Sequence, residues 1–405
     1  MKKYIKTFMM AILASVAAGS CTEGDKFDPD REIVLISGTD DSPIVKIDSD
    51  VYGLTVSATG RATEDVTVWL KYDKSAVDAY NAANKTSYRP VPESAVRLDS
   101  DHVVIPKGQA SSAINNLTIT SHDFAEEGYI YVVPVVISDV KGGSYEILES
   151  ANCILVRPTN EFTFNALDIA TAEMSSNFIF PDDKAISLST YTYEIKFYAY
   201  SLKDTGTDAI CRLCAWEAKD EAKANMLRFG ENGHPGHSLQ LVSPAGNIIS
   251  NTLFDPGKWY MLSLVYDGST MTMYVNGVPE ATKGTGDGTT TFQRFEMGMS
   301  WGGYPSRQLF SGRISEMRVW NRALSVSEMQ EGICSVPRDS EGLCAYWRFN
   351  EGEGYIFHDS TGNGYDMDWS RTCRDVSENG VLVELDKSSV AEGRWVYDEL
   401  NKCRN

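Results

Sequence analysis

The sequence predicts an all-β protein built from two sandwich domains in series. Runs of about four to eight branched and aromatic residues recur along the chain, separated by turns rich in Gly, Pro, Asn and Asp. Helical spacing is confined to two short stretches, residues 76–86 and 326–332. With 405 residues, of which 42% are hydrophobic, the chain can bury a substantial core and form two or three domains.

Residues 1–20 have the three parts of an export signal. Three lysines precede an apolar run, Phe8 to Ala18, which is much shorter than the roughly 20 residues that span a bilayer. Small residues directly ahead of Cys21 resemble a bacterial lipobox, although Ala18 stands where leucine is more usual. The resemblance implies that Cys21 is lipidated. The alternative is an ordinary secretory signal followed by an incidental cysteine.

Residues 21–32 are expected to form an acidic tether between the lipid and the first domain. Glu23, Asp25 and Asp28 resemble the surface-export signals of Bacteroidota lipoproteins, which implies an outer-membrane protein facing the cell exterior. Removing residues 1–20 takes away three lysines and no acidic residue, so the net charge of −19 becomes −22. This charge repels nucleic acid and favours an uncharged partner such as a neutral glycan.

Residues 33–158 are expected to form the first domain, an immunoglobulin-like sandwich of short strands with one helix. Val77 and Tyr80 fall at helical spacing, and Asp73 can cap the helix. The strands are predicted at Ile33–Ile36, Val66–Leu70, His102–Ile105, Ile114–Ile119, Tyr129–Ile137 and Asn152–Val156.

Three pieces of this region carry a family resemblance: AVDAYNAANKTSYRPVPESAVRL, an IPKGQ turn and the YIYVVPVVI strand. Together they resemble domain of unknown function 1735, which heads many Bacteroidota surface lipoproteins encoded with glycan-foraging machinery. The resemblance implies a spacer or docking module, and no motif in it indicates chemistry.

Residues 162–373 are expected to form the second domain. The central stretch is WYMLSLVYDGSTMTMYVNGVP, residues 259–279, which predicts a β-hairpin followed by a tight Asn-Gly turn. It is followed in order by GRISEMRVWNRALS, AYWRFNEGEG and DSTGNG. The series resembles the laminin G-like jelly rolls of the concanavalin A-like lectin and glucanase superfamily. The resemblance implies two antiparallel sheets packed face to face, one of them concave, in a fold that carries lectins, adhesion modules and glycosidases alike.

Local patterns place further elements of this domain. Ser325 and Glu328 form a capping box that starts a short helix, Val326 to Gly332, after the strand Arg313 to Trp320. Tyr346 and Trp347 must point to opposite sides of their strand, so this strand is expected to be buried on both faces.

The glucanases of the superfamily carry an E-x-D-x-E strand that aims two carboxylates into the concave face. Here the corresponding strand, Tyr193 to Tyr200, has Lys196 in place of the central aspartate. Glu351 and Glu353 flank a loop glycine and are interpreted as structural. No catalytic residue is therefore assigned.

Sugar binding requires an exposed aromatic face and a few polar groups. The loop Met299 to Gln308 supplies Trp301 and Tyr304 among glycines and a proline, with Arg307 as a forked donor. These three residues are the predicted glycan site. The alternative is that Trp301 covers the edge of the core.

No cofactor or metal is predicted. Cys211-x-x-Cys214 and His234-x-x-His237 resemble a zinc constellation, but residues three apart on a strand point to opposite faces, so a buried thiol or a short-loop disulfide is favoured. The resemblance admits a structural calcium ion at Asp359 and Asn363, yet DSTGNG is equally typical of a turn.

Eight cysteines in an exported chain predict disulfides, and lipidation of Cys21 would leave seven. We expect Cys334 to pair with Cys344 across a Pro- and Gly-containing connection, and Cys373 to pair with Cys403 and tie down the tail. Residues 374–405 are too short to fold alone and are expected to pack on the jelly roll.

The sequence therefore predicts a non-catalytic, lipid-anchored surface protein that binds glycan for a carbohydrate-uptake system, with outer-membrane uptake proteins as further partners. The first alternative is a protein-protein adhesion module on the cell surface. The second alternative is a glycoside hydrolase of the concanavalin A-like class.

Overall fold

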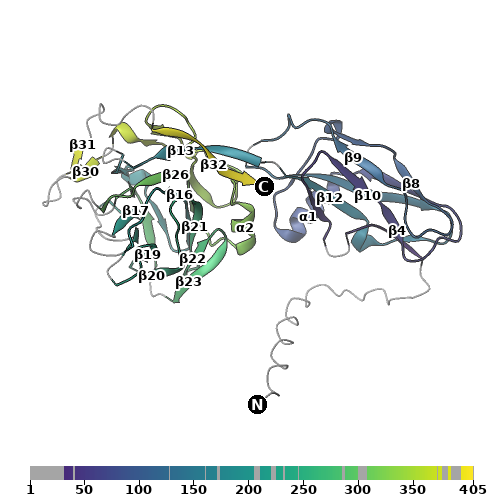
Figure 1. Cartoon of the computed structure of the whole chain (residues 1–405), viewed down its shortest axis with the longest axis horizontal. Coiled ribbons are helices and arrows are strands. Elements are labelled where there is room, and N and C mark those ends of the chain that lie inside the picture. The colour runs from purple at the N-terminus through teal and green to yellow at the C-terminus, as the bar shows by residue number, and fades with distance from the viewer. Residues whose placement is uncertain are drawn as a thin grey trace, which may run out of the picture. The chain divides into compact units, whose positions relative to one another are not determined.

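The computed structural model of the chain describes residues 32–39, 42–126, 128–159, 161–170, 174–204, 210–219, 225–230, 233–244, 246–284, 288–299, 308–371, 373–375, 382–384 and 394–404. The chain divides into two compact units (Figure 1). Unit 1 takes the described residues up to His122 and Val132–Pro158, and unit 2 takes Asp123–Tyr131 and the residues from Thr159 onward. The export signal and Cys21 lie outside the described residues.

Unit 1 consists of short strands and one helix, as the sequence predicts. Its strands are β1 (Ile33–Ile36), β2 (Ile44–Ile47), β3 (Val51–Leu54), β4 (Val56–Ala58), β5 (Val66–Tyr72), β6 (Arg89–Pro90), β7 (Val96–Leu98), β8 (His102–Ile105), β9 (Asn115–Ile119), β10 (Tyr131–Lys141), β11 (Glu146–Ile147) and β12 (Cys153–Pro158). They pair in the orders β11-β1-β4, β2-β12-β10-β5-β8 and β3-β9-β7, with β6 on β10. Alternating burial along β5 and β9 gives each strand one core face.

The helix of unit 1, α1 (Ser75–Asn84), starts beside the predicted cap. Lys74 occupies the N-cap position, but the carboxylate of Asp73 accepts hydrogen bonds from the backbone N–H of Ser75 at 3.1 Å and from its hydroxyl at 2.6 Å. The hydrogen bonds from Ser75 and Lys71 lower the pKa of Asp73 to about 2. The aspartate therefore stabilises the helix start from one residue further out than expected.

Unit 2 is a sandwich of two large sheets. Sheet I has the order β23-β22-β21-β16-β26-β13-β32, with β27 also on β26, and sheet II has the order β20-β19-β18-β17-β25-β14-β30-β31. Sheet I contains β13 (Glu161–Asp168), β16 (Tyr191–Ala199), β21 (Trp259–Tyr266), β22 (Thr270–Val275), β23 (Val278–Gly284), β26 (Gly312–Trp320), β27 (Leu343–Trp347) and β32 (Trp395–Arg404).

In the part of the chain that the structure describes, neighbouring strands of sheet II are antiparallel. It contains β14 (Ser176–Ile179), β17 (Cys211–Glu217), β18 (Asn225–Phe229), β19 (Ser238–Val242), β20 (Ile248–Leu253), β25 (Arg294–Met297), β30 (Cys373–Asp375) and β31 (Leu382–Glu384). Two small pairs lie beside the large sheets: β15 (Ile186–Leu188) with β24 (Thr290–Phe292), and β28 (Ile356–Phe357) with β29 (Met367–Asp368).

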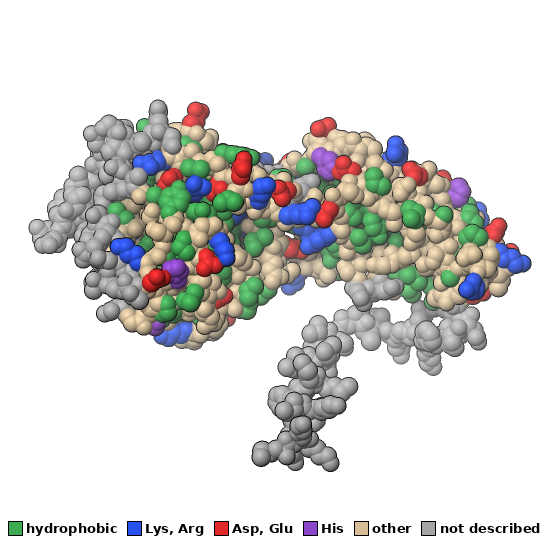
Figure 2. All heavy atoms as spheres, viewed as in Figure 1, with side chains coloured by type: hydrophobic (Ala, Val, Ile, Leu, Met, Phe, Trp, Pro, Cys, Tyr) green, Lys and Arg blue, Asp and Glu red, His purple; other side chains and the backbone are tan. Residues whose placement is uncertain are grey.

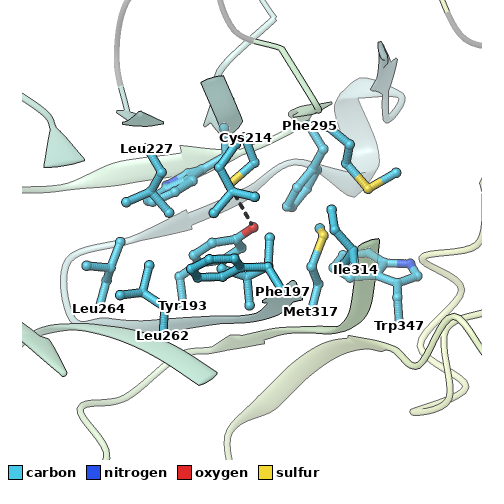
Figure 3. Close-up of a cluster of buried hydrophobic side chains, with 14 of the residues drawn as sticks. Tyr193, Phe197, Cys214, Leu227, Leu262, Leu264, Phe295, Ile314, Met317 and Trp347 are labelled. Carbon is cyan, nitrogen blue, oxygen red and sulfur yellow. Dashed lines mark hydrogen bonds between the residues drawn. The ribbon is translucent and has the colours of Figure 1, made fainter. Parts of the chain in front are cut away.

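The core of unit 2 fills the space between the two sheets. Figure 3 shows Tyr193, Phe197 and Leu262 from sheet I facing Cys214 and Leu227 from sheet II. The hydroxyl of Tyr193 and the sulfur of Cys214 lie 3.6 Å apart, in hydrogen-bond contact across the sandwich. The predicted all-β architecture, with a concanavalin A-like jelly roll as its second part, is confirmed.

The strand β27 is buried on both faces, as its sequence predicts. Trp347 belongs to the main core, whereas Tyr346 belongs to a second cluster on the outer face of sheet I. The second cluster lies under α2 (Val326–Glu331), which contributes Met329. The predicted capping box of Ser325 and Glu328 starts this helix. The helix and the connection to β27 thus cover one half of the outer face of sheet I.

The C-terminal residues belong to both sheets, and their disulfide corrects the predicted pairs. Cys403 on β32 is bonded to Cys334, with a sequence separation of 69 residues and 5.3 Å between their Cα atoms. Both the predicted Cys334–Cys344 and Cys373–Cys403 pairs are therefore wrong. The reason is that β32 pairs with β13 and so reaches the end of the α2 segment, while β27 keeps Cys344 as a free, half-buried thiol.

Cys211 and Cys214 are free thiols, and no disulfide joins them. A bulge between Arg212 and Cys214 shifts the phase of β17, so Cys211 packs against the core of which Cys214 is part. His237 instead contacts Phe254 and Asp204. The zinc interpretation has no support in this geometry. Because of the bulge, Cys211 and Cys214 do not take opposite faces of β17, contrary to the prediction.

The described helices and the charges on one face concern the surroundings of the protein. Within the described ranges, no helix is long and apolar enough to cross a membrane. On the face drawn in Figure 2, acidic and basic side chains are scattered over both units among uncharged groups.

Candidate functional site

The predicted glycan loop follows β25 of sheet II in the chain. Trp301, Tyr304 and Arg307 lie in a stretch that the structure leaves undescribed, so this prediction is untested. Its flanks are described: the backbone N–H of Phe310 donates to the carbonyl of Gly298 at 3.0 Å, which brings the two ends of the loop together. The side chain of Gln308 accepts a hydrogen bond of 3.0 Å from Nε of Arg212 on β17.

Sheet II carries two buried carboxylates bound to one arginine. Glu217 on β17 and Glu296 on β25 both pair with Arg294, and both carboxylates are almost fully buried. A guanidinium bound to two carboxylates offsets part of their charge and engages their oxygens in charge-assisted hydrogen bonds. The two carboxylates and Arg294 therefore link the neighbouring strands β17 and β25 and have a structural role.

A second such group includes β16, the strand that corresponds to the carboxylate-bearing strand of the glucanases. Glu194 on β16 accepts hydrogen bonds from Arg318 at 3.2 Å, from the indole of Trp320 at 3.0 Å and from Ser263 at 2.8 Å. Arg318 also pairs with Glu316 and donates to the carbonyl of Gly332, which caps the C-terminus of α2, at 2.8 Å. Burial raises the pKa of Glu316, although Arg318 opposes the shift. These carboxylates lie under the α2 segment and have structural roles.

The other half of the outer face of sheet I carries a group of partly exposed aromatic rings. Trp259, Tyr198 and Arg313 lie side by side in register on β21, β16 and β26. The rings of Tyr198 and Trp259 are 5.5 Å apart and tilted by 51°, and Tyr200 meets Tyr198 edge to face at 5.8 Å. We name these residues, together with Asp398, the aromatic platform.

The polar ends of the platform hold one another in place. The guanidinium of Arg313 lies 5.3 Å from the ring of Tyr198 and 5.1 Å from that of Tyr200. Its Nε donates to the hydroxyl of Tyr200 at 2.7 Å, and its terminal nitrogen contacts Asp398 at 2.6 Å. The indole N–H of Trp259 donates to the same carboxylate oxygen of Asp398 at 2.9 Å. The rings are thus oriented by fixed partners before any ligand arrives.

Beneath the platform lies a buried lysine. Lys196 is 6% exposed, and its Nζ has no hydrogen-bond partner among the residues that the structure describes. The ammonium is 5.2 Å from the ring centre of Phe164 and 5.9 Å from that of Trp259. Burial lowers its pKa, and the nearby Glu316 opposes this shift. The lysine supplies positive charge below two aromatic faces.

The platform has the chemistry that sugar recognition uses. The C–H faces of a pyranose stack on partly exposed tryptophan and tyrosine rings, and the partly exposed guanidinium of Arg313 can donate hydrogen bonds to sugar hydroxyls. It contains no group placed to attack a bond, since the carboxylate of Asp398 is already held by Arg313 and Trp259. The arrangement is suited to holding a ligand.

This site is not predicted by the sequence. One local signal existed: Tyr198 follows the core residue Phe197 and so must point outward from β16. No local signal connects Tyr198 to Trp259 or to Asp398, because strand pairing between distant segments creates those contacts. The sequence pattern around Trp259 predicts only that this residue is part of a β-hairpin.

The loop carboxylates considered for metal or acid chemistry have structural partners. Asp359 accepts hydrogen bonds from the backbone N–H groups of Tyr346, Thr361 and Tyr365, which supports the turn interpretation of DSTGNG. Glu351 accepts from the backbone of His358. Over the described part of the chain, no group of three or more His, Cys, Asp or Glu is placed to hold a metal ion.

Comparison with known families and structures agrees with this fold. Residues 173–330 match the family model described as the concanavalin A-like lectin/glucanases superfamily, and residues 31–144 match a family model of an N-terminal domain. Both matches fall where the sequence resemblances were found, so the recognition is confirmed. A search of the curated proteins finds no match.

Among solved structures, the chain is similar to a candidate carbohydrate-binding protein from Bacteroides ovatus. The identity is 22%, the match covers 83% of this chain and 95% of that chain, and the TM-score is 0.53. A SAP-like pentraxin from Limulus polyphemus matches at 16% identity over 43% of this chain and 83% of its own, with a TM-score of 0.34. The first of these similarities supports the fold.

Proposed function

Because residues 173–330 form a domain of the concanavalin A-like lectin/glucanase superfamily, we propose that the chain binds glycan and does not cleave it. The observation that carries this proposal is the aromatic platform, in which Tyr198, Tyr200 and Trp259 present partly exposed rings beside hydrogen-bonding groups. The two pairs of carboxylates that bind Arg294 and Arg318 are committed to those arginines, which supports binding over hydrolysis.

The platform has enough rings to reach a millimolar affinity. One stacked ring contributes on the order of 1 kcal/mol, and a millimolar dissociation constant corresponds to about 4 kcal/mol. Two or three rings with several hydrogen bonds therefore reach this range. The loop with Trp301, Tyr304 and Arg307 remains a second candidate contact for a longer glycan. The flanks of this loop belong to sheet II, whereas the platform lies on sheet I.

The ligand that fits best is an uncharged glycan. Arg313 is already paired with Asp398, and Lys196 lies close to Glu316 and Asp398, so each cation near the platform has a carboxylate beside it. An acidic sugar would add negative charge to this group and would approach a mature chain of net charge −22, since loss of three lysines lowers the value of −19.

The site would act at the cell surface. Lipidation at Cys21 would anchor the chain in the outer membrane, and the acidic tether would direct it to the exterior beside glycan-uptake proteins. The similarity to a candidate carbohydrate-binding protein of Bacteroides ovatus supports the glycan ligand. Labelling with a fatty-acid analogue tests the anchor: we expect label on the wild-type chain and none on Cys21→Ala. A labelled Cys21→Ala variant would refute lipidation at this residue.

A glycan array probed with the mature chain tests the binding function. We expect retention on neutral polysaccharides or oligosaccharides, with intact glycan recovered afterwards. A silent array combined with capture of a defined surface protein would favour the adhesion alternative. Shortened glycan after incubation would favour the hydrolase alternative. Either result would contradict the proposal.

A further inference from the structure

Asp398 is the residue at which the contacts of the platform converge. It is 4% exposed, and one carboxylate oxygen accepts from the indole of Trp259 at 2.9 Å and contacts Arg313 at 2.6 Å. The other oxygen accepts from the backbone N–H of Leu400 at 2.8 Å. Both oxygens are therefore used, one toward the platform and one toward the strand that carries the residue.

That strand is the last one in the chain, and an irregularity turns Asp398 toward the platform. β32 lies at the edge of sheet I beside β13 (Figure 1). The pairing shifts between Thr163, which faces Lys402, and Asn165, which faces Tyr397, so residues 398–401 form a bulge opposite Phe164. Bulges commonly re-aim side chains near functional sites.

The bulge is fixed on its far side by a buried amide and a covalent bond. Asn401 is fully buried, and its amide donates to the hydroxyl of Ser315 on β26 at 2.8 Å. Two residues later, Cys403 is bonded to Cys334 at the end of the α2 segment. Asp398 is thus held between strand pairing on one side and this anchor on the other.

We infer that β32 completes the glycan site and that Asp398 is its positioning residue. The inference rests on the proposed function, because it assigns a role within the same platform. Asp398 fixes the ring plane of Trp259 through the indole N–H and keeps Arg313 between the two tyrosines. A ring held in its bound orientation loses less freedom when a sugar stacks on it, which raises affinity. The residue lies outside residues 173–330, the part that matches the family model.

The position of β32 depends on whether the disulfide between Cys334 and Cys403 is formed. Reduction of Cys334–Cys403 leaves β32 attached by edge pairing to β13 and by the contacts of Asn401 and Asp398. We expect the strand to loosen and the glycan affinity to fall, while the rings themselves stay on β16 and β21.

The test compares Asp398→Ala, Asp398→Asn and Cys403→Ser in the full mature chain, with Lys402→Ala as control. Lys402 is exposed on the same strand and pairs with Glu161 at 3.0 Å, away from the platform. Glycan affinity is measured by calorimetry with the best ligand from the array. We expect a loss of about tenfold for Asp398→Ala and a smaller loss for Asp398→Asn, which keeps an acceptor for the indole. Lys402→Ala should bind like wild type.

A second readout separates positioning from general destabilisation and needs no glycan. In a ¹⁵N spectrum, the indole N–H signal of Trp259, identified by its loss in Trp259→Ala, should move in Asp398→Ala and stay in place in Lys402→Ala. An unmoved indole signal, or wild-type affinity in Asp398→Ala, would overturn the inference. If the indole moves but the wild-type chain binds no glycan, the proposed function fails while the positioning of Trp259 stands.

Discussion

Arg318 on β26 and Glu194 on β16 lie directly opposite each other, with their side chains 3.2 Å apart and both almost fully buried. Glu316 pairs with the same guanidinium, and the ring of Tyr346 lies 5.1 Å from it. One arginine therefore pairs with two carboxylates under α2. This group occupies the strand where a glucanase would carry its catalytic acids.

We predict that Arg318→Met destabilises unit 2 by about 3 to 5 kcal/mol, because it leaves buried carboxylates without their cation. Burial already raises the pKa of Glu316, and loss of Arg318 raises it further. A carboxyl with a raised folded-state pKa costs stability above that pKa and regains it as the pH falls. Urea unfolding at pH 8 and pH 5 should therefore show a smaller deficit at pH 5.

The control for this measurement is Arg322→Met. Arg322 pairs with Glu328 at 2.7 Å, and about a third of each side chain is exposed, so its removal should cost about 1 kcal/mol or less. Equal losses for the two variants, or a deficit in Arg318→Met that grows at pH 5, would contradict the role assigned to the buried group.

Peptide mapping under non-reducing conditions should recover Cys334 and Cys403 in one linked fragment. Cys344 should appear as a free thiol. The strand β27 directs it away from Cys334, and its sulfur contacts the carbonyl of Gly342. A linked Cys334–Cys344 fragment would show that β32 is not fixed as described, and would also remove the anchor proposed for Asp398.

Alkylation should distinguish the thiols of β17 from those of an unfolded chain. Burial raises the pKa of Cys211 and that of Cys214 to about 12. Because the thiolate is the reactive form, iodoacetamide at pH 8 should modify both about a hundredfold or more slowly in the folded protein than in urea. Rapid labelling of Cys214 without urea would mean that the two sheets do not close over it.

The sequence was sufficient wherever the structure depends on neighbouring residues. Alternation along β16 separates the core residue Phe197 from the outward Tyr198, the capping box starts α2, and the adjacent Tyr346 and Trp347 are both buried. These features follow from the period of a strand and the chemistry of a helix start, which act within a few residues.

The sequence was insufficient wherever distant segments meet. The Cys334–Cys403 pair depends on β32 joining sheet I at β13, and nothing local to either cysteine indicates that pairing. A single bulge in β17 was enough to change the face expected for Cys211. The platform has the same origin, since Trp259 and Asp398 come together only through the order of strands in the sheet.

The central claim, that the aromatic platform binds glycan, is tested most directly by calorimetric titration of the array-selected glycan into wild type, Trp259→Ala and Tyr397→Ala. Tyr397 is 67% exposed on the same sheet but makes no contact described for the platform, so it serves as a matched aromatic control. We predict a loss of about tenfold in affinity for Trp259→Ala and none for Tyr397→Ala. Unchanged affinity in Trp259→Ala would contradict the account.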